Sequence, residues 1–352
     1  MNKFFLTFVG LLFFSCGNDL EMASYKVVSE ASTEERSVDV IELQGENFGP
    51  EGQFGYLTDI LLVNSSLVFQ DIKKEYAFSH LEDGEKLSRF QPIGLGKGEV
   101  ENADFVKIVD YDEMSKEIHF FNYSTKSLSS ISVLPNSVPY IYGAVPGLYW
   151  GDIQSAVGLN DSLVAITGRF SDAKFIIFNK NTQKEVLRSK YLNSFPNELS
   201  EEARISVSPT DIKYNDKHEL VVLNKPSVNS IDVYSTNGAP EKFYSFGEMR
   251  NISDENIFSR DYFYYYSVKT HGDVAYGLYL GMRQDVMAVQ DVFASRTRPE
   301  LHVYNLVTDD LQRFKLDRLV NACVLNTESS ILYCIEENNE DQPLVRYEIP
   351  KI

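Results

Sequence analysis

Residues 59–70 read DILLVNSSLVFQ, which is an apolar strand, a tight polar turn and a second apolar strand. The pattern returns five times, in FVKIVDYDEMSKEIHFF from Phe105, AVGLNDSLVAITG from Ala156, TDIKYNDKHELVVLN from Thr210, YSVKTHGDVAYGLYL from Tyr266 and ACVLNTESSILYCI from Ala322. Asn, Asp and Gly suit such turns because they tolerate left-handed backbone angles. The chain therefore carries six copies of one hairpin unit.

A second hairpin follows in most units, and its first strand ends in an aromatic residue. These aromatics are Phe78, Phe178, Tyr234 and Tyr304. The second unit shows only three clear strands, in EIHFFNYSTKSLSSISV and the hairpin before it. Six units of four strands predict an all-β fold, a six-bladed β-propeller over residues 37–352.

The two ends of this region predict how the ring closes. The last unit has three strands and ends in LVRYEIP, while the segment SVDVIEL at 37–43 belongs to no unit. We expect this N-terminal strand to complete the last blade, because the pairing would remove an exposed edge.

The first fifteen residues, MNKFFLTFVGLLFFS, combine a cation at Lys3 with an apolar run from Phe4 to Phe14. That run is shorter than the roughly 20 residues that span a bilayer, so residues 1–15 predict a cleaved export signal. The segment resembles the bacterial lipobox, which implies that Cys16 is acylated and becomes the new N-terminus. A plain secretory signal with an incidental cysteine is the alternative. The polar, acidic residues 16–36 predict a flexible tether.

The chain has 51 acidic and 33 basic residues, a formal charge of −18. This charge excludes nucleic acid as a partner, because nucleic acids are held by basic surfaces. It also excludes electrostatic docking to anionic lipid, so we expect the lipid anchor to be the only membrane attachment.

Two further cysteines, Cys323 and Cys334, flank the last hairpin turn. If Thr327–Ser330 form a four-residue loop, the two cysteines face each other across the hairpin and can form a disulfide. Two buried free thiols are the alternative.

The long connections of the predicted propeller gather on one face, formed by the links between blades and between second and third strands. We call it the long-loop face. Loops gathered on a rigid scaffold commonly carry binding sites, although these loops could equally serve only to seal the ring. The candidate binding residues on this face are Trp150, Tyr149, Tyr142, Arg283, Arg296 and Arg298.

Motifs for catalysis and metal binding are missing from the sequence. The segment GLGKGE from Gly94 lacks the Gly-Lys-Ser/Thr of a phosphate-binding loop, and the five histidines have no metal-ligand spacing. We therefore predict no metal centre and no cofactor. The acidic pairs Asp110 with Asp112 and Asp309 with Asp310 leave calcium as an alternative, because calcium prefers oxygen ligands.

With these features in place, the chain resembles the TolB-like six-bladed propeller lipoproteins of Gram-negative bacteria. The residues that carry the resemblance are Cys16, the loop GLGKGEVENADF at 94–105, the strand VAYGLYLG at 274–281 and ELHVYNL at 300–306. Lys97 and Val100 stand where the family has proline and phenylalanine in that loop. The resemblance implies a propeller anchored by lipid to the outer membrane, and it transfers no catalytic residue.

These observations predict a binding or scaffolding module of the cell envelope, whose partner is a protein, a peptide or a glycan. The alternative is an envelope enzyme, a hydrolase or lyase acting on polysaccharide or peptide. Fold alone does not decide between them.

Overall fold

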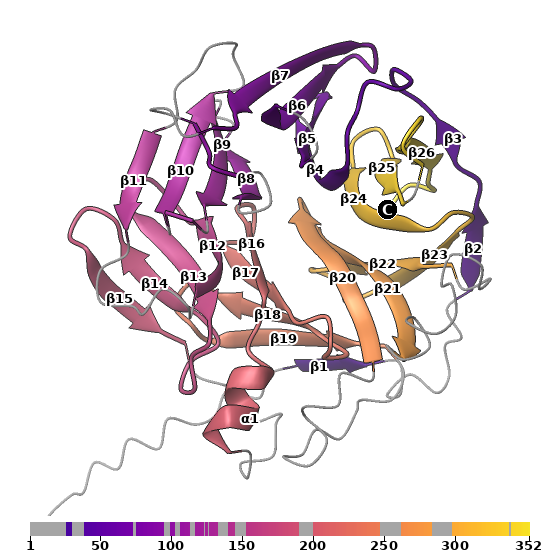
Figure 1. Cartoon of the computed structure of the whole chain (residues 1–352). Coiled ribbons are helices and arrows are strands. Elements are labelled where there is room, and N and C mark those ends of the chain that lie inside the picture. The colour runs from indigo at the N-terminus through magenta and orange to yellow at the C-terminus, as the bar shows by residue number, and fades with distance from the viewer. Residues whose placement is uncertain are drawn as a thin grey trace, which may run out of the picture.

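The computed structural model is a ring of six small β-sheets, each of which forms one blade (Figure 1). The first strand of each blade lies nearest the axis of the ring, and the later strands lie successively farther out. The all-β six-bladed propeller predicted from the repeats is confirmed. The structure describes residues 26–29, 39–72, 75–94, 99–102, 106–112, 117–122, 124–125, 127–132, 140–144, 153–189, 200–246, 262–283, 298–337 and 339–352.

The first three blades follow the chain in order. Their strands are β4 (Leu57–Val63), β5 (Ser66–Asp71), β6 (Tyr76–Glu82) and β7 (Lys86–Pro92); β8 (Val106–Asp112), β9 (Glu117–Asn122), β10 (Ser127–Ser132) and β11 (Tyr140–Ala144); and β12 (Ile153–Gly158), β13 (Leu163–Gly168), β14 (Ile176–Asn179) and β15 (Lys184–Arg188). Blade two thus has four strands, and β11 is the one that the sequence pattern did not show clearly; its pairing with β10 is irregular between Ser127 and Ser129.

The last three blades continue in the same way, and the final one borrows a strand from the N-terminal segment. Their strands are β16 (Asp211–Asn215), β17 (Leu220–Asn224), β18 (Ile231–Ser235) and β19 (Pro240–Ser245); β20 (Tyr262–His271), β21 (Val274–Arg283), β22 (Glu300–Asn305) and β23 (Leu311–Leu316); and β24 (Val320–Asn326), β25 (Ile331–Glu336), β26 (Leu344–Glu348) and β3 (Glu46–Asn47).

The turns between first and second strands are built as the repeat predicted. The Asn160 side-chain oxygen accepts hydrogen bonds from the backbone N–H groups of Ser162 and Leu163, at 2.9 and 3.0 Å. Asn326 holds the last such turn in the same way. Asn64 adopts a left-handed φ of 54°, a conformation that asparagine tolerates better than most residues.

The aromatic residues of the third strands pack between neighbouring blades. Phe78 in blade one lies 5.4 Å from Phe120 in blade two, measured between ring centroids. Tyr304 in blade five stacks on Tyr244 in blade four at 4.6 Å. Because burial of such a side chain contributes roughly 1.5 to 3 kcal/mol, these aromatics hold adjacent blades together.

One short helix, α1 (Glu201–Ser206), lies in the connection between blades three and four, where we expected only a loop. The Ser200 hydroxyl accepts a hydrogen bond from the Ala203 N–H at 3.2 Å, and Glu201 and Glu202 carry negative charge in the first turn. Both features stabilise a helix N-terminus. Across the described ranges, no helix has the length and apolar content needed to cross a bilayer.

The N-terminal segment contacts three blades along the outside of the ring (Figure 1). Strand β1 (Lys26–Ser29) pairs in parallel with β19 of blade four, and β2 (Val40–Leu43) pairs in parallel with β23 of blade five. Strand β3 pairs antiparallel with β26 of blade six. We call β1, β2 and β3 the N-terminal strap.

The strap corrects two predictions. An N-terminal strand does complete the last blade, but residues 46–47 form it, and the predicted segment 37–43 contributes β2 to blade five instead. Residues 26–29, which we assigned to the flexible tether, form a strand. The physical reason is the same in both cases, because the rims of blades four and five offer open strand edges for pairing.

Cys323 and Cys334 face each other on β24 and β25 and form a disulfide in the structure. Their Cα atoms are 4.1 Å apart. The Cys323 N–H donates to the Ser267 hydroxyl of blade five at 3.2 Å, away from its strand partner, as in a non-hydrogen-bonded pair. The register is the one that a loop over 327–330 predicted.

Arg318 ties the strap to the last blade. Its guanidinium donates to Glu336 Oε2 at 2.9 Å, to the Gly45 carbonyl at 3.0 Å and to Asn47 Oδ1. Gly45 itself has no room for a side chain, since an added Cβ would lie 2.4 Å from Val345. Arg318 thus joins the strap to the last blade, beside the backbone pairing of β3 with β26 and the Gly45 N–H, which donates to Asp317 at 3.1 Å.

Substituting Arg318→Met should lower the free energy of unfolding by about 2 kcal/mol, because it removes the cation paired with Glu336 and the donor to the Gly45 carbonyl. Urea denaturation measures this loss. Arg346→Met is the matched control, since the exposed Arg346–Glu46 ion pair in the same closure should be worth less than about 1 kcal/mol. Equal losses in the two variants would contradict the role given to Arg318.

Candidate functional site

Five charged side chains from the innermost strands approach one another around the propeller axis. They are Asp59 on β4, Lys107 on β8, Asp211 and Lys213 on β16, and Lys269 on β20. We call them the axial cluster. An innermost strand pairs on one side only, so its other edge carries backbone groups that the sheet does not satisfy. Long lysine side chains can reach those groups from other blades.

Asp211 is the acceptor in one half of the cluster. Lys107 of blade two donates to Asp211 Oδ1 of blade four at 3.1 Å, and the Ser155 hydroxyl of blade three donates to the same oxygen at 3.4 Å. Lys213 Nζ lies 3.7 Å from that oxygen and donates to the Val109 carbonyl of blade two at 3.4 Å. Three successive blades therefore meet at one carboxylate.

Asp59 is the acceptor in the other half. Lys269 of blade five donates to Asp59 Oδ1 of blade one at 2.8 Å and also to the Ile60 carbonyl. The two aspartates are held alike, because each accepts from the backbone N–H of the next residue, at 2.8 Å in Asp59 and 2.9 Å in Asp211. Their orientation is thus fixed by their own strands.

The two carboxylates are stabilised in their ionised form. Burial alone would raise the pKa of each, but Lys269 and Lys213 hold the pKa of Asp59 below its usual range. Lys107 and Lys213 do the same for the pKa of Asp211. Burial lowers the pKa of Lys269, an effect that Asp59 offsets in part and the nearby Lys213 charge increases. Lys213 therefore acts on both halves of the cluster.

The cluster combines three ammonium groups with two carboxylates, an excess of one positive charge in a chain whose formal charge is −18. The exposed fractions of its side chains run from 10 % for Lys269 to 27 % for Lys107, so solvent still reaches them. Such a site can bind an anion, because attraction is stronger where water is partly excluded.

A second polar network lies inside blade five. His302, which is fully buried, bonds through Nδ1 to the Tyr265 hydroxyl and through Nε2 to Glu300 Oε2, both at 3.0 Å. Arg313 also donates to Glu300, and Tyr304 bonds to the Tyr265 hydroxyl at 2.7 Å. Both nitrogens of His302 are therefore occupied by neighbours within the blade.

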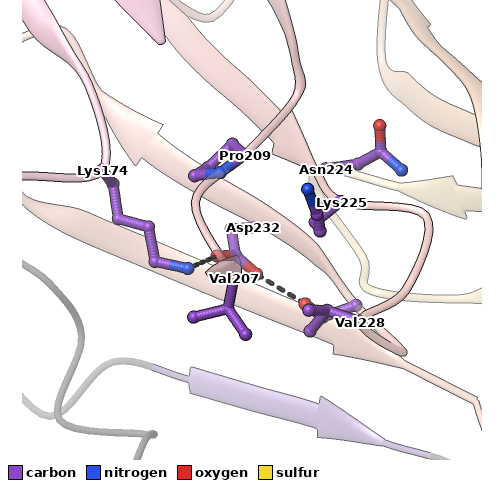
Figure 2. Close-up of a pocket in the computed structure, with 8 residues that line it drawn as sticks. Lys174, Val207, Pro209, Asn224, Lys225, Val228 and Asp232 are labelled. Carbon is purple, nitrogen blue, oxygen red and sulfur yellow. Dashed lines mark hydrogen bonds and ion pairs between the residues drawn. The ribbon is translucent and has the colours of Figure 1, made fainter. Parts of the chain in front are cut away.

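A small pocket of about 190 Å³, its opening included, lies between blades three and four (Figure 2). Lys174 and Asp232 form an ion pair at its wall with a separation of 3.0 Å, and both side chains are at least 95 % buried. The Ser230 hydroxyl donates to the other Asp232 oxygen at 2.8 Å. Lys225 also lines the pocket, so its wall carries two lysines and one carboxylate.

The structure places only part of the predicted binding set. Trp150, Tyr149 and Arg296 lie outside the described residues, as does Cys16. Arg298 is exposed just before β22, and Arg283 is the last residue of β21 at the start of the same long link. Both residues thus lie at the ends of the link between the second and third strands of blade five.

The position of Tyr142 differs from the prediction that it lies in a loop of the long-loop face. It lies within β11, the fourth strand of blade two, and so belongs to a blade edge and not to a loop of that face. The Tyr-Ile-Tyr sequence at 140–142 has strong strand propensity, which explains why this part of the expected connection pairs with β10 instead.

The axial cluster was missed, although the sequence held a signal for it. The tripeptide Thr-Asp-Ile occurs at 58–60 and again at 210–212, and both copies enter a first strand. A charged residue inside an otherwise apolar inner strand, repeated between units, marks the axis of a propeller. Aligning the units against each other would have revealed the repeated aspartate.

The calcium alternative receives no support from the described acids. Asp309 accepts from Lys242 at 2.7 Å and from the Tyr244 hydroxyl at 3.0 Å, and Asp310 accepts from Thr308. The side chains of Asp110 and Asp112 lie outside the described part of the structure. Within the part that is described, no three His, Cys, Asp or Glu side chains gather closely enough to hold a metal ion.

Comparisons with known proteins agree on the fold. No protein-family model matches the chain, and no curated protein does. A Bacteroides fragilis protein named as exported is 12 % identical with a TM-score of 0.56, covering 88 % of this chain and 99 % of its own. A member of the DUF4221 family from Bacteroides vulgatus is 13 % identical with a TM-score of 0.56, covering 88 % and 96 %.

A gluconolactonase from Xanthomonas campestris is also similar, with 8 % identity, a TM-score of 0.51 and coverage of 85 % of this chain and 88 % of its own. Identities this low show a shared fold alone. The TolB-like family suggested by the sequence has no family match to support it.

Acid should destabilise the protein through His302. Burial lowers its pKa below the value of about 6.5 expected in the unfolded chain, so the unfolded state takes up a proton first as the pH falls. The free energy of unfolding should therefore decrease below about pH 6.5, by up to about 1.4 kcal/mol per pH unit.

Urea denaturation between pH 5 and pH 8 tests this, with His302→Gln as the comparison. The variant should lose most of the slope and keep the smaller share that His80 contributes, since burial lowers the pKa of His80 as well. Parallel curves for the two proteins would show that His302 does not cause the pH dependence.

Proposed function

We propose that this protein is a lipid-anchored module of the bacterial cell envelope that binds a protein, peptide or glycan through its long-loop face. The axial cluster would lie at the centre of that face. The export signal and Cys16 of the sequence support the location, and the propeller fold supports a rigid platform for loops.

The position of the axial cluster is the observation that carries the proposal. Asp211, Lys107 and Asp59 are the first, second and third residues of their strands, whereas Lys213 is the third of five and Lys269 the eighth of ten. The chain enters those strands from the long connections between blades, so the three residues lie toward the long-loop face. A ligand seated there would meet fixed charges surrounded by loops.

The pairing of the charges favours binding over catalysis. Each described carboxylate of the cluster accepts hydrogen bonds from a lysine and from its own strand. Groups held in this way suit recognition, because a proton acceptor in catalysis must be open to its substrate. The Bacteroides fragilis neighbour, which is named as exported, is consistent with an envelope location, and the similar gluconolactonase supports the enzyme alternative.

Cys16→Ala should release the protein from membranes into the soluble envelope fraction. The lipid is the only attachment that we expect, because a chain of formal charge −18 is repelled by anionic lipid. Fractionation of cells that express either form measures the change. A variant that remains with the membranes would refute the anchor.

Purified protein that begins at residue 17 can be used to distinguish binding of a ligand from its chemical conversion. Incubation with envelope glycan and peptide fractions, followed by mass spectrometry of the retained and unbound material, should recover ligand of unchanged mass. Products of lower mass would establish the enzyme alternative, and no retention of either fraction would refute the binding module.

Charge reversal locates the binding face in the same assay. Arg298→Glu on the exposed approach to β22 should weaken retention about tenfold, which corresponds to about 1.4 kcal/mol. Lys184→Glu, an equal charge reversal on the exposed outer strand of blade three, should leave retention unchanged. Equal effects of both variants would show that retention is not specific to the long-loop face.

A further inference from the structure

We propose that the axial cluster binds a carboxylate group of the ligand and that Lys213 is the principal cation of the site. This inference rests on the proposed function, because it names the chemistry that the long-loop face recognises. Its evidence is the uneven way in which the three lysines of the cluster are satisfied.

Lys213 is the least satisfied of them. An ammonium group can donate three hydrogen bonds. Among the described residues, Lys213 makes one long hydrogen bond of 3.4 Å to the Val109 carbonyl, and its distance of 3.7 Å from Asp211 Oδ1 is too long for another. Lys107 and Lys269 lie 3.1 and 2.8 Å from their carboxylates.

The surroundings of Lys213 make its unsatisfied N–H groups unfavourable for the stability of the folded protein. Its side chain is only 12 % exposed, so water replaces the missing partners poorly. A cation in such a place is stabilised when an anion approaches and supplies acceptors. Asp211 cannot do so fully, because Lys107 and Ser155 already donate to the same oxygen.

The charge balance indicates which anion fits. Among the side chains that the structure describes, the cluster has three ammonium groups and two carboxylates, so one negative charge neutralises this set. A carboxylate carries that charge, whereas a phosphate monoester carries about −1.5 to −2 at neutral pH and would overshoot. A polyanion would also be repelled by the acidic surface of the chain.

Two envelope ligands present a single carboxylate, namely a uronic acid of a glycan and the C-terminus of a peptide. They share the group that the site would recognise, and they differ in what surrounds it. Glucuronate and N-acetyl-triglycine serve as probes, with glucose and N-acetyl-triglycine amide as the neutral counterparts.

Isothermal titration of the full mature chain should detect at least one of the two carboxylates and neither neutral counterpart. Lys213→Met should weaken that binding at least tenfold, and Lys213→Arg should restore part of it. Lys217→Met is the matched control. Lys217 lies on the same hairpin, is 53 % exposed and pairs with Asp273 at 2.6 Å, so its loss should leave the affinity unchanged.

A chemical measurement on the unaltered protein covers the case in which Lys213→Met does not fold. The bound carboxylate should protect Lys213 from acetylation, while Lys217 reacts at an unchanged rate in the same sample. Mass spectrometry of tryptic peptides reads both sites.

Equal affinity for charged and neutral probes, no binding of either carboxylate, or unprotected Lys213 would overturn the inference. If this occurs while envelope fractions are still retained, the proposed function stands without it. If a carboxylate binds through Lys213 but no envelope fraction is retained, the inference holds and the proposed function fails.

Discussion

Each blade leaves the inner edge of its first strand without a sheet partner, and the rest of the ring depends on how those edges are satisfied. A buried carbonyl without a donor costs about 1 to 3 kcal/mol. Here lysines supply donors from across the axis, as Lys269 does for Ile60 and Lys213 for Val109. The same ammonium groups contact Asp59 and Asp211, so the axis is held by ion pairs that connect blades one, two, four and five. A change in the number of blades would separate these partners.

The outer edges of the blades also carry unpaired backbone groups, and the strap pairs with these edges in three blades. Parallel pairing of β1 with β19 and of β2 with β23 covers two rims, and β3 closes the last blade through only two residue pairs, Val345 with Asn47 and Arg346 with Glu46. So short a ladder cannot hold a ring alone. Arg318 and the contacts around Gly45 supply what the ladder lacks. Closure is therefore a side-chain interaction as much as a β-sheet.

The repeat, its turns and the facing cysteines could be predicted because their signals are local, within one hairpin. The partners of the strap could not, since a short strand of alternating residues fits any open edge, and β1 meets residues more than 200 positions away. The axial cluster could not be predicted either, because its members also come from distant parts of the chain. Asp59 and Asp211 stand in visible repeats, but Lys269 and Asp59 are 210 residues apart, and only the closed ring brings them together. Tyr142 was misplaced because a rim strand and a loop rich in tyrosine look alike in sequence.

Stability and binding are linked at the axial cluster. Replacing partly buried ion pairs with packed apolar side chains commonly leaves a protein as stable or makes it more so. Lys269 pairs with Asp59, whereas Lys107 and Lys213 share Asp211, with Lys213 the more distant of the two at 3.7 Å. An anion that pairs with Lys213 would remove this imbalance and stabilise the folded ring in proportion to its occupancy. On this proposal the excess charge lowers the stability of the free ring, and a bound anion would restore it.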